Sequence, residues 1–122
     1  MRRLTGRWLI PCVLLAFVAG CQTASVIGSA IEDRPLKDGV YTGSYSNWPN
    51  GAKVEVTVKG GRIEHVEVLR HFSSWKGWDV NTIIPQRIVE AQSTRVDVVS
   101  GATNSSVVVM NAAEKALEKA RP

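Results

Sequence analysis

Runs of alternating apolar and polar residues in the middle of the chain predict β-strands. These runs cover residues 40–47, 52–59 and 62–71. In the clearest of them Val54, Val56 and Val58 share one face, and charged or polar side chains share the other. The Gly60-Gly61 pair between the last two runs is typical of a tight hairpin turn. The pattern therefore predicts an antiparallel sheet of at least three strands.

The third run does not alternate perfectly. Ile63 is out of phase with Val66 and Val68, and Leu69 then returns to the phase of Ile63. Two explanations remain open from the sequence: a β-bulge near His65, or a strand that is buried on both faces.

Two later stretches have helical spacing. Ile84, Ile88 and Ala91 share one face of a helix predicted over residues 83–93, and Pro85 fits its first turn. Residues 72–80, before this helix, are expected to form an irregular loop.

A second helix is predicted over residues 107–120. Its apolar stripe consists of Val109, Met110, Ala113, Ala116, Leu117 and Ala120. Glu114 and Glu118 are expected on the opposite, solvent-exposed side. A small antiparallel sheet packed against two helices gives an α+β fold.

The first twenty residues resemble a bacterial lipoprotein signal. Arg2, Arg3 and Arg7 precede an apolar run at 8–18, and the run ends in a lipobox-like sequence at 18–21. Three segments follow from this: a signal peptide at 1–20, a flexible tether at 21–36 and one folded domain at 37–122.

Under this interpretation Cys21 is the lipid-bearing first residue of the mature chain, and the domain is anchored in the cell envelope, outside the cytoplasm. A plain secretory signal and a short uncleaved anchor are the alternatives, and both also lead to the envelope.

Charge and cysteine content exclude several classes. The chain of 122 residues has a formal net charge of +4, and three arginines fall in the signal, so the remainder is near +1. This argues against nucleic acid as a partner. Cys12 lies in the signal, so Cys21 alone cannot form an internal disulfide. His65 and His71 have no cysteine beside them at metal-binding spacing, so no metal site is expected.

A small polar turn precedes the second helix. Ser100, Gly101, Thr103 and Asn104 place hydroxyl and amide groups where free backbone N–H groups and the positive end of the helix dipole converge. Such a turn suits an anion, above all a phosphate. The same residue types are also ordinary helix caps, and local chemistry alone favours that interpretation.

The turn also carries a resemblance. Asp97, Ser100, Gly101, Ala102 and Thr103 fill every position of the flavinylation motif of the FMN-binding domain family, which includes flavin-carrying subunits of the Rnf and Nqr redox complexes. The similarity extends to residues 38–43, 54–58, 60–63 and 83–93. In that family a separate flavin transferase attaches FMN, through its phosphate, to the last threonine of the motif, which is Thr103 here.

The resemblance implies an extracytoplasmic electron-transfer module that carries FMN and is not itself an enzyme. Its implied partners are the flavin transferase, a redox partner protein or membrane electron-transfer complex, and the membrane through the lipid anchor. The cofactor-binding residues are then Thr103, Ser100, Gly101, Ala102, Asp97, Asn104 and Trp78, with no catalytic or metal-binding residue.

Several side chains remain open as flavin contacts. Trp75 and Trp78 are candidates for stacking, His71 for a hydrogen bond, and Lys76 and Arg87 for the phosphate; each also has an ordinary structural explanation. Two other functions remain as alternatives: a domain that binds FMN without a covalent bond, and a structural or partner-binding lipoprotein without flavin.

Overall fold

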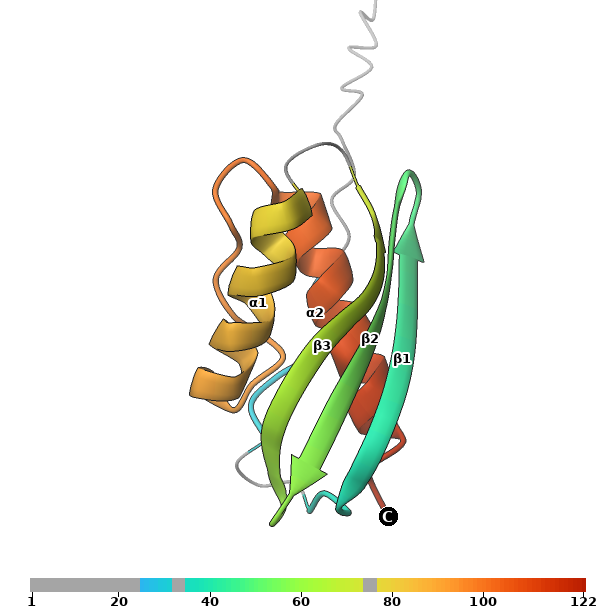
Figure 1. Cartoon of the computed structure of the whole chain (residues 1–122), viewed down its shortest axis with the longest axis vertical. Coiled ribbons are helices and arrows are strands. Elements are labelled where there is room, and N and C mark those ends of the chain that lie inside the picture. The colour runs from blue at the N-terminus through green and yellow to red at the C-terminus, as the bar shows by residue number, and fades with distance from the viewer. Residues whose placement is uncertain (1–24, 32–34, 74–76) are drawn as a thin grey trace, which may run out of the picture.

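The computed structural model describes residues 25–31, 35–73 and 77–122 of the chain. Its elements are β1 (Gly39–Asn47), β2 (Asn50–Lys59), β3 (Arg62–Phe72), α1 (Gly77–Ala91) and α2 (Thr103–Glu118). The strands form one antiparallel sheet in the order β1-β2-β3, and both helices cover the same face of it (Figure 1). The predicted α+β fold is confirmed. The expected signal and Cys21 lie outside the described residues, as do Trp75 and Lys76.

Two bulges explain the irregular pattern of β3. Glu64 and Leu69 each have no partner on β2, because the residues on both sides of them pair with consecutive residues of that strand. Ile63 and Val66 are thereby both buried, while Leu69 is 42% exposed. Of the two explanations left open by the sequence, the bulge is correct.

Helix α1 begins six residues earlier than predicted. It starts at Gly77, so Pro85 lies inside the helix and not in its first turn. An interior proline costs a helix roughly 3 kcal/mol. Val80, Ile84 and Ile88 are fully buried at a spacing of four residues, and their packing on the sheet offsets this cost. The prediction placed the start of α1 too late because it assigned Val80, the first residue of this apolar stripe, to the preceding loop.

Helix α2 begins at Thr103, four residues before the predicted start, and is enclosed on nearly every side. The expected stripe is buried, but so are Val107, Val108, Asn111 and Glu114 on other sides of the helix. Glu118 is exposed as expected, whereas the prediction for Glu114 is wrong: only 4% of it is accessible.

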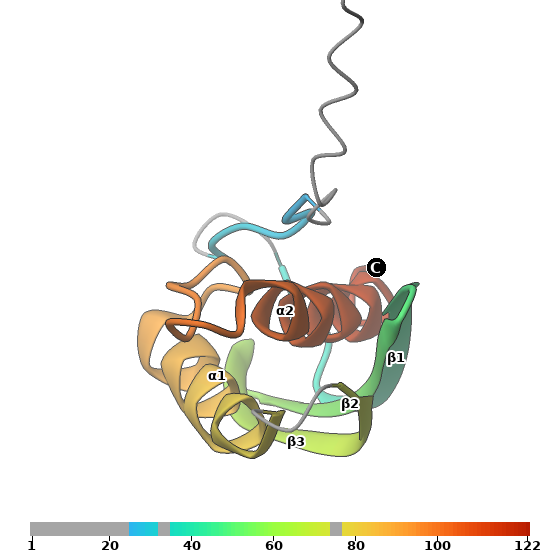
Figure 2. The ribbon, with the colours of Figure 1, turned by 90° about the horizontal axis from the view of Figure 1, so that it is seen from above.

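The outer side of α2 is covered by residues 25–31, here called the strap. Figure 2 shows α2 lying between the sheet and this segment. The Ile27 backbone N–H donates to Asn111 Oδ1 at 3.1 Å, and Asn111 Nδ2 donates to the Ser25 carbonyl at 2.9 Å. Arg95 donates to the carbonyls of Gly28 and Val26 at 3.2 and 3.1 Å. Part of the segment expected as a flexible tether is therefore bound to the domain.

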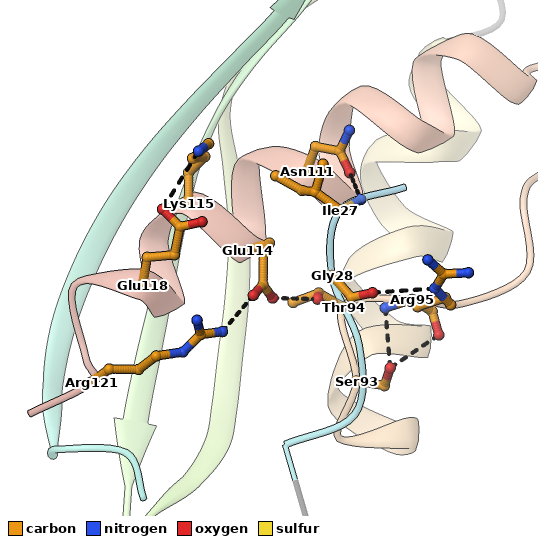
Figure 3. A network of polar contacts seen from close by, with 10 residues as sticks. All are labelled: Ile27, Gly28, Ser93, Thr94, Arg95, Asn111, Glu114, Lys115, Glu118 and Arg121. Atoms are coloured by element: carbon orange, nitrogen blue, oxygen red, sulfur yellow. Dashed lines mark hydrogen bonds and ion pairs between the residues drawn. The ribbon is translucent and has the colours of Figure 1, made fainter. Parts of the chain in front are cut away.

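The strap also explains why a glutamate lies inside the domain. Glu114 accepts hydrogen bonds from Thr94 Oγ1, at 2.6 Å, and from the Arg121 guanidinium (Figure 3). A Cβ on Gly28 would come within 1.8 Å of that Thr94 hydroxyl oxygen. Position 28 must be glycine for the strap to lie this close.

One end of the molecule gathers several chain segments. The β1–β2 turn, the end of β3 and the beginnings of both helices lie together at the upper end of Figure 1, where the loop at 92–102 also arrives. The turn that contains Thr103 is at this end. No helix among the described residues is both long and apolar enough to cross a membrane.

Candidate functional site

The start of α2 is built by a tight turn with no capping side chain. Gly101 has φ of 78°, a conformation that favours glycine, and the Ala102 N–H donates to the Val99 carbonyl at 3.0 Å. Ala102 then occupies the N-cap position and has no side-chain oxygen to accept from the first N–H groups of the helix. There is no acidic residue in the first turn. The positive end of the helix dipole is therefore not neutralised from within this turn.

Ser106 holds the turn from inside. Its hydroxyl accepts a hydrogen bond from the Val99 backbone N–H at 3.0 Å and donates to the Ala102 carbonyl at 2.7 Å. The serine is fully buried. These two bonds fix both ends of the segment that leads into Thr103.

Arg87 of α1 holds the same segment from outside. Its guanidinium donates to the Asp97 carbonyl at 2.8 Å and to the Val98 carbonyl at 3.3 Å. A hollow of about 460 Å³ lies beside this contact and is lined by Arg87, Glu90, Ala91, Arg95, Val96 and Asp97. The turn is thus fixed on both sides, and the Asp97 side chain remains exposed.

Thr103 and Asn104 are the side chains at the helix start. Thr103 is exposed, so its hydroxyl can be reached from solvent. The Asn104 Oδ1 atom is buried and has no hydrogen-bond partner among the described residues. An exposed hydroxyl and an unpartnered buried oxygen beside uncapped N–H groups fit a ligand that carries both a phosphate and hydrogen-bond donors.

The other candidate residues are distributed as follows. Ser100 and Gly101 are exposed in the same turn, next to Ala102 and Thr103. Trp78 is the second residue of α1, and its side chain lies outside the described part. Arg87 donates through Nη1 to two backbone carbonyls, so part of its guanidinium is used to hold the chain.

His71 lies near the end of β3 and contacts α1. Its Nδ1 is 2.6 Å from Asn81 Oδ1, and since a carbonyl oxygen can only accept, Nδ1 carries the proton. Burial lowers the pKa of His71 below its ordinary value of 6.5, although the Asn81 hydrogen bond acts in the opposite direction. The ring is therefore held neutral, and its buried Nε2 has no partner within the described part of the chain.

Within the residues that the structure describes, no three His, Cys, Asp or Glu side chains come together as a metal site.

These features define a small α+β module in which a mostly buried helix begins at an exposed, uncapped turn. The chain belongs to the FMN-binding domain family, whose family model matches residues 49–118. FMN is therefore the cofactor of this domain, and such a domain fits the role of a carrier better than that of a catalyst.

Two individual proteins are also similar to this chain. An uncharacterized protein of Treponema pallidum (strain Nichols) is 40% identical over 89 residues, which is 71% of this chain and 24% of that protein. The chain thus spans about a quarter of that relative's length. The crystal structure of the CPE2226 protein from Clostridium perfringens has a TM-score of 0.57 at 25% identity, over 70% of this chain and 88% of the other.

Two supporting residues were missed by sequence reasoning. Ser106 follows Ser105 in a hydroxyl-rich stretch, and nothing local distinguishes the serine that bonds the turn from the one that does not. Arg87 was considered only as a phosphate ligand or a surface charge. Its actual acceptors lie ten and eleven residues later, and only the chain reversal between α1 and α2 brings them together.

Proposed function

We propose that this protein is an extracytoplasmic electron carrier whose FMN is bound covalently, by a phosphoester bond to the Thr103 hydroxyl. The observation that carries the proposal is the exposed Thr103 side chain at the uncapped start of α2. The complete flavinylation motif around it, in a chain of the FMN-binding domain family, supports the same assignment.

The chemistry of attachment constrains the donor. Forming a phosphoester from a free phosphate and a hydroxyl would release water and is uphill in an aqueous compartment, so an activated donor is needed. A flavin dinucleotide supplies one. The bond from Thr103 Oγ1 to phosphorus forms as the pyrophosphate bond breaks, and a nucleoside monophosphate leaves. The hydroxyl proton passes to a base of the separate flavin transferase, because the described part of this chain has no titratable side chain bonded to Thr103.

After attachment, each part of the site has its own role. The first N–H groups of α2 and its dipole stabilise the phosphate charge. Asn104 Oδ1 is available as an acceptor, and Ser106 with Arg87 keeps the turn in one conformation. The flavin itself supplies the redox chemistry, since it accepts and passes on electrons.

A covalent bond suits the expected location. The signal-like residues 1–20 and Cys21 support a lipid-anchored protein outside the cytoplasm. A domain of this size cannot enclose FMN deeply, and a flavin lost there would be hard to replace. Attachment removes dissociation as a route of loss. The partners are the transferase and a redox partner protein or membrane electron-transfer complex.

Intact-mass analysis tests the proposal. The chain is produced with and without a flavin transferase, denatured and weighed. We expect a mass gain equal to FMN minus water, and a yellow colour that persists after denaturation. Thr103→Ala should abolish both and Thr103→Ser should retain part. Thr82→Ala, which removes an exposed helical threonine from α1, is the matched control and should leave both unchanged.

The alternatives give different results. Yellow colour that is lost on denaturation indicates FMN bound without a covalent link. A colourless, unmodified chain from cells that contain the transferase indicates a structural or partner-binding protein. Covalent flavin on the Thr103→Ala variant would show that the attachment residue is misassigned.

A further inference from the structure

The end of the domain that carries Thr103 also carries an exposed aromatic and basic surface. It consists of Trp48, Lys53, Arg70 and Phe72, here called the hairpin-end patch. Trp48 lies in the β1–β2 turn and is 93% exposed, and Phe72 at the end of β3 is 70% exposed. Figure 1 places this turn and this strand end at the same end as the start of α2.

The two basic residues of the patch are neighbours across the sheet. Lys53 and Arg70 are directly paired in register on β2 and β3, and both are exposed. Phe72 is two residues beyond Arg70, so both point to the sheet face that the helices leave open. A shallow hollow of about 190 Å³ on this face is lined by Lys53, Arg70 and Phe72 together with Ser44, Ser46, Gly51 and Ala52.

Like charges directly opposite one another destabilise a sheet. Among the described residues no ion pair involves Lys53 or Arg70. The next cross-strand pair on this face, Glu55 with Glu67, is also alike in charge and lies farther from the turn. The positive pair therefore lies nearer to the β1–β2 turn, and the negative pair lies farther from it. This arrangement suits contact between the turn end of the sheet and an extended anionic surface.

The path of the strap indicates which surface this is. The strap passes Asn111 at Ser25 and Glu114 at Gly28, so it runs toward the C-terminal end of α2. Ser25, where the described part of the strap begins, is therefore the end of the strap nearer to the start of α2. Cys21 precedes Ser25 by four residues, which span at most about 14 Å. From Asn111 back to Thr103 the helix rises by about 12 Å, so the lipid-bearing residue can lie level with the patch.

We infer that the hairpin-end patch is a membrane contact, in which Lys53 and Arg70 bind anionic lipid headgroups and Trp48 and Phe72 enter the interface. Tryptophan prefers this depth, and basic residues gain from an anionic leaflet. The inference rests on the envelope location of the proposed function and is independent of the flavin.

Vesicle partitioning of an unanchored chain tests the inference. Residues 21–122 with Cys21→Ser are mixed with vesicles of phosphatidylcholine alone, or of phosphatidylcholine and phosphatidylglycerol in equal parts. We expect binding to the anionic vesicles that weakens as salt is added. Lys53→Gln with Arg70→Gln should lower the partition coefficient by about tenfold or more, since each basic residue contributes roughly fivefold.

The chain offers a matched control. Lys59 and Arg62 form the same kind of like-charged pair at the opposite end of the hairpin, so Lys59→Gln with Arg62→Gln should leave partitioning unchanged apart from a small net-charge effect. Emission of Trp48, isolated by difference from a Trp48→Phe variant, should shift to shorter wavelength only with anionic vesicles. Circular dichroism of each variant checks its fold.

Equal effects of the two pairs, or no binding at low salt, would overturn the membrane contact and leave the patch to a protein partner. Neither result bears on Thr103, because partitioning is measured whether or not flavin is attached. Conversely, a chain that stays without flavin when produced with the transferase, but binds anionic vesicles through the patch, would refute the proposed function alone.

Discussion

Removing the Ser106 hydroxyl should loosen the attachment turn while sparing the helix that supports it. In Ser106→Ala the Val99 N–H loses its acceptor, whereas the Ala102 carbonyl keeps its bond from the Ser106 backbone N–H at 2.9 Å. An unsatisfied, partly buried N–H costs about 2 kcal/mol. The better helix propensity of alanine returns about 0.5 kcal/mol. The free energy of unfolding should fall by about 1.5 kcal/mol.

Thermal unfolding measures this loss directly. For a domain of this size, each kcal/mol shifts the Tm by roughly 4–8 °C, so Ser106→Ala should lower the Tm by about 6–12 °C. Ser105→Ala is the control, because Ser105 is also buried but its hydroxyl has no hydrogen-bond partner among the described residues. Its Tm should stay the same or rise slightly.

The same pair of variants tests the link to function. If the hydroxyl fixes the turn, Ser106→Ala should accept flavin from the transferase several times more slowly than Ser105→Ala at a temperature where both are folded. Equal melting temperatures for the two variants would refute the structural reasoning. Equal attachment rates with unequal melting temperatures would refute the idea that the turn must be held in one conformation.

Three further changes have defined outcomes. Arg87→Met removes the two bonds to the Asp97 and Val98 carbonyls, so attachment of flavin, followed by mass, should slow several-fold with a Tm loss worth about 1 kcal/mol. Gly43→Ala would place a Cβ 2.2 Å from the Ala116 backbone nitrogen, and denaturant unfolding should show a loss of about 3 kcal/mol or more. Because the pKa of His71 is lowered in the folded state, the unfolded state takes up its proton first; the free energy of unfolding should fall as the pH drops below about 6.5, and less so in His71→Asn.

The sheet was predictable because its information is local. The alternating valines of β2 and the Gly60-Gly61 turn determine a hairpin without reference to the rest of the chain. The bulges of β3 were visible as a break in phase. The start of α2 was placed too late because its polar first turn carries no apolar stripe, and the start of α1 because Pro85 was taken as a start signal.

The contacts that support the site were not predictable in the same way. Glu114 looks like a surface residue in its own helix, and its burial is tolerable because Thr94 and Arg121, which lie outside that helix, both donate to its carboxylate. Arg87 likewise depends on a chain reversal. The attachment turn itself was recognised by resemblance, since its residues are equally typical of an ordinary helix cap.

The enclosure of α2 has a consequence for how a group on Thr103 would move. From Ser105 to Glu114 every residue of this helix is buried, so the amide protons of this part should exchange with solvent only when the whole domain opens. Ser100 and Gly101, immediately before it, are in water. A border between the slowest and the fastest exchanging amides thus falls within a few residues of Thr103. If flavin is bonded to Thr103 as proposed, its point of attachment stays fixed while the cofactor itself can pivot about the linkage.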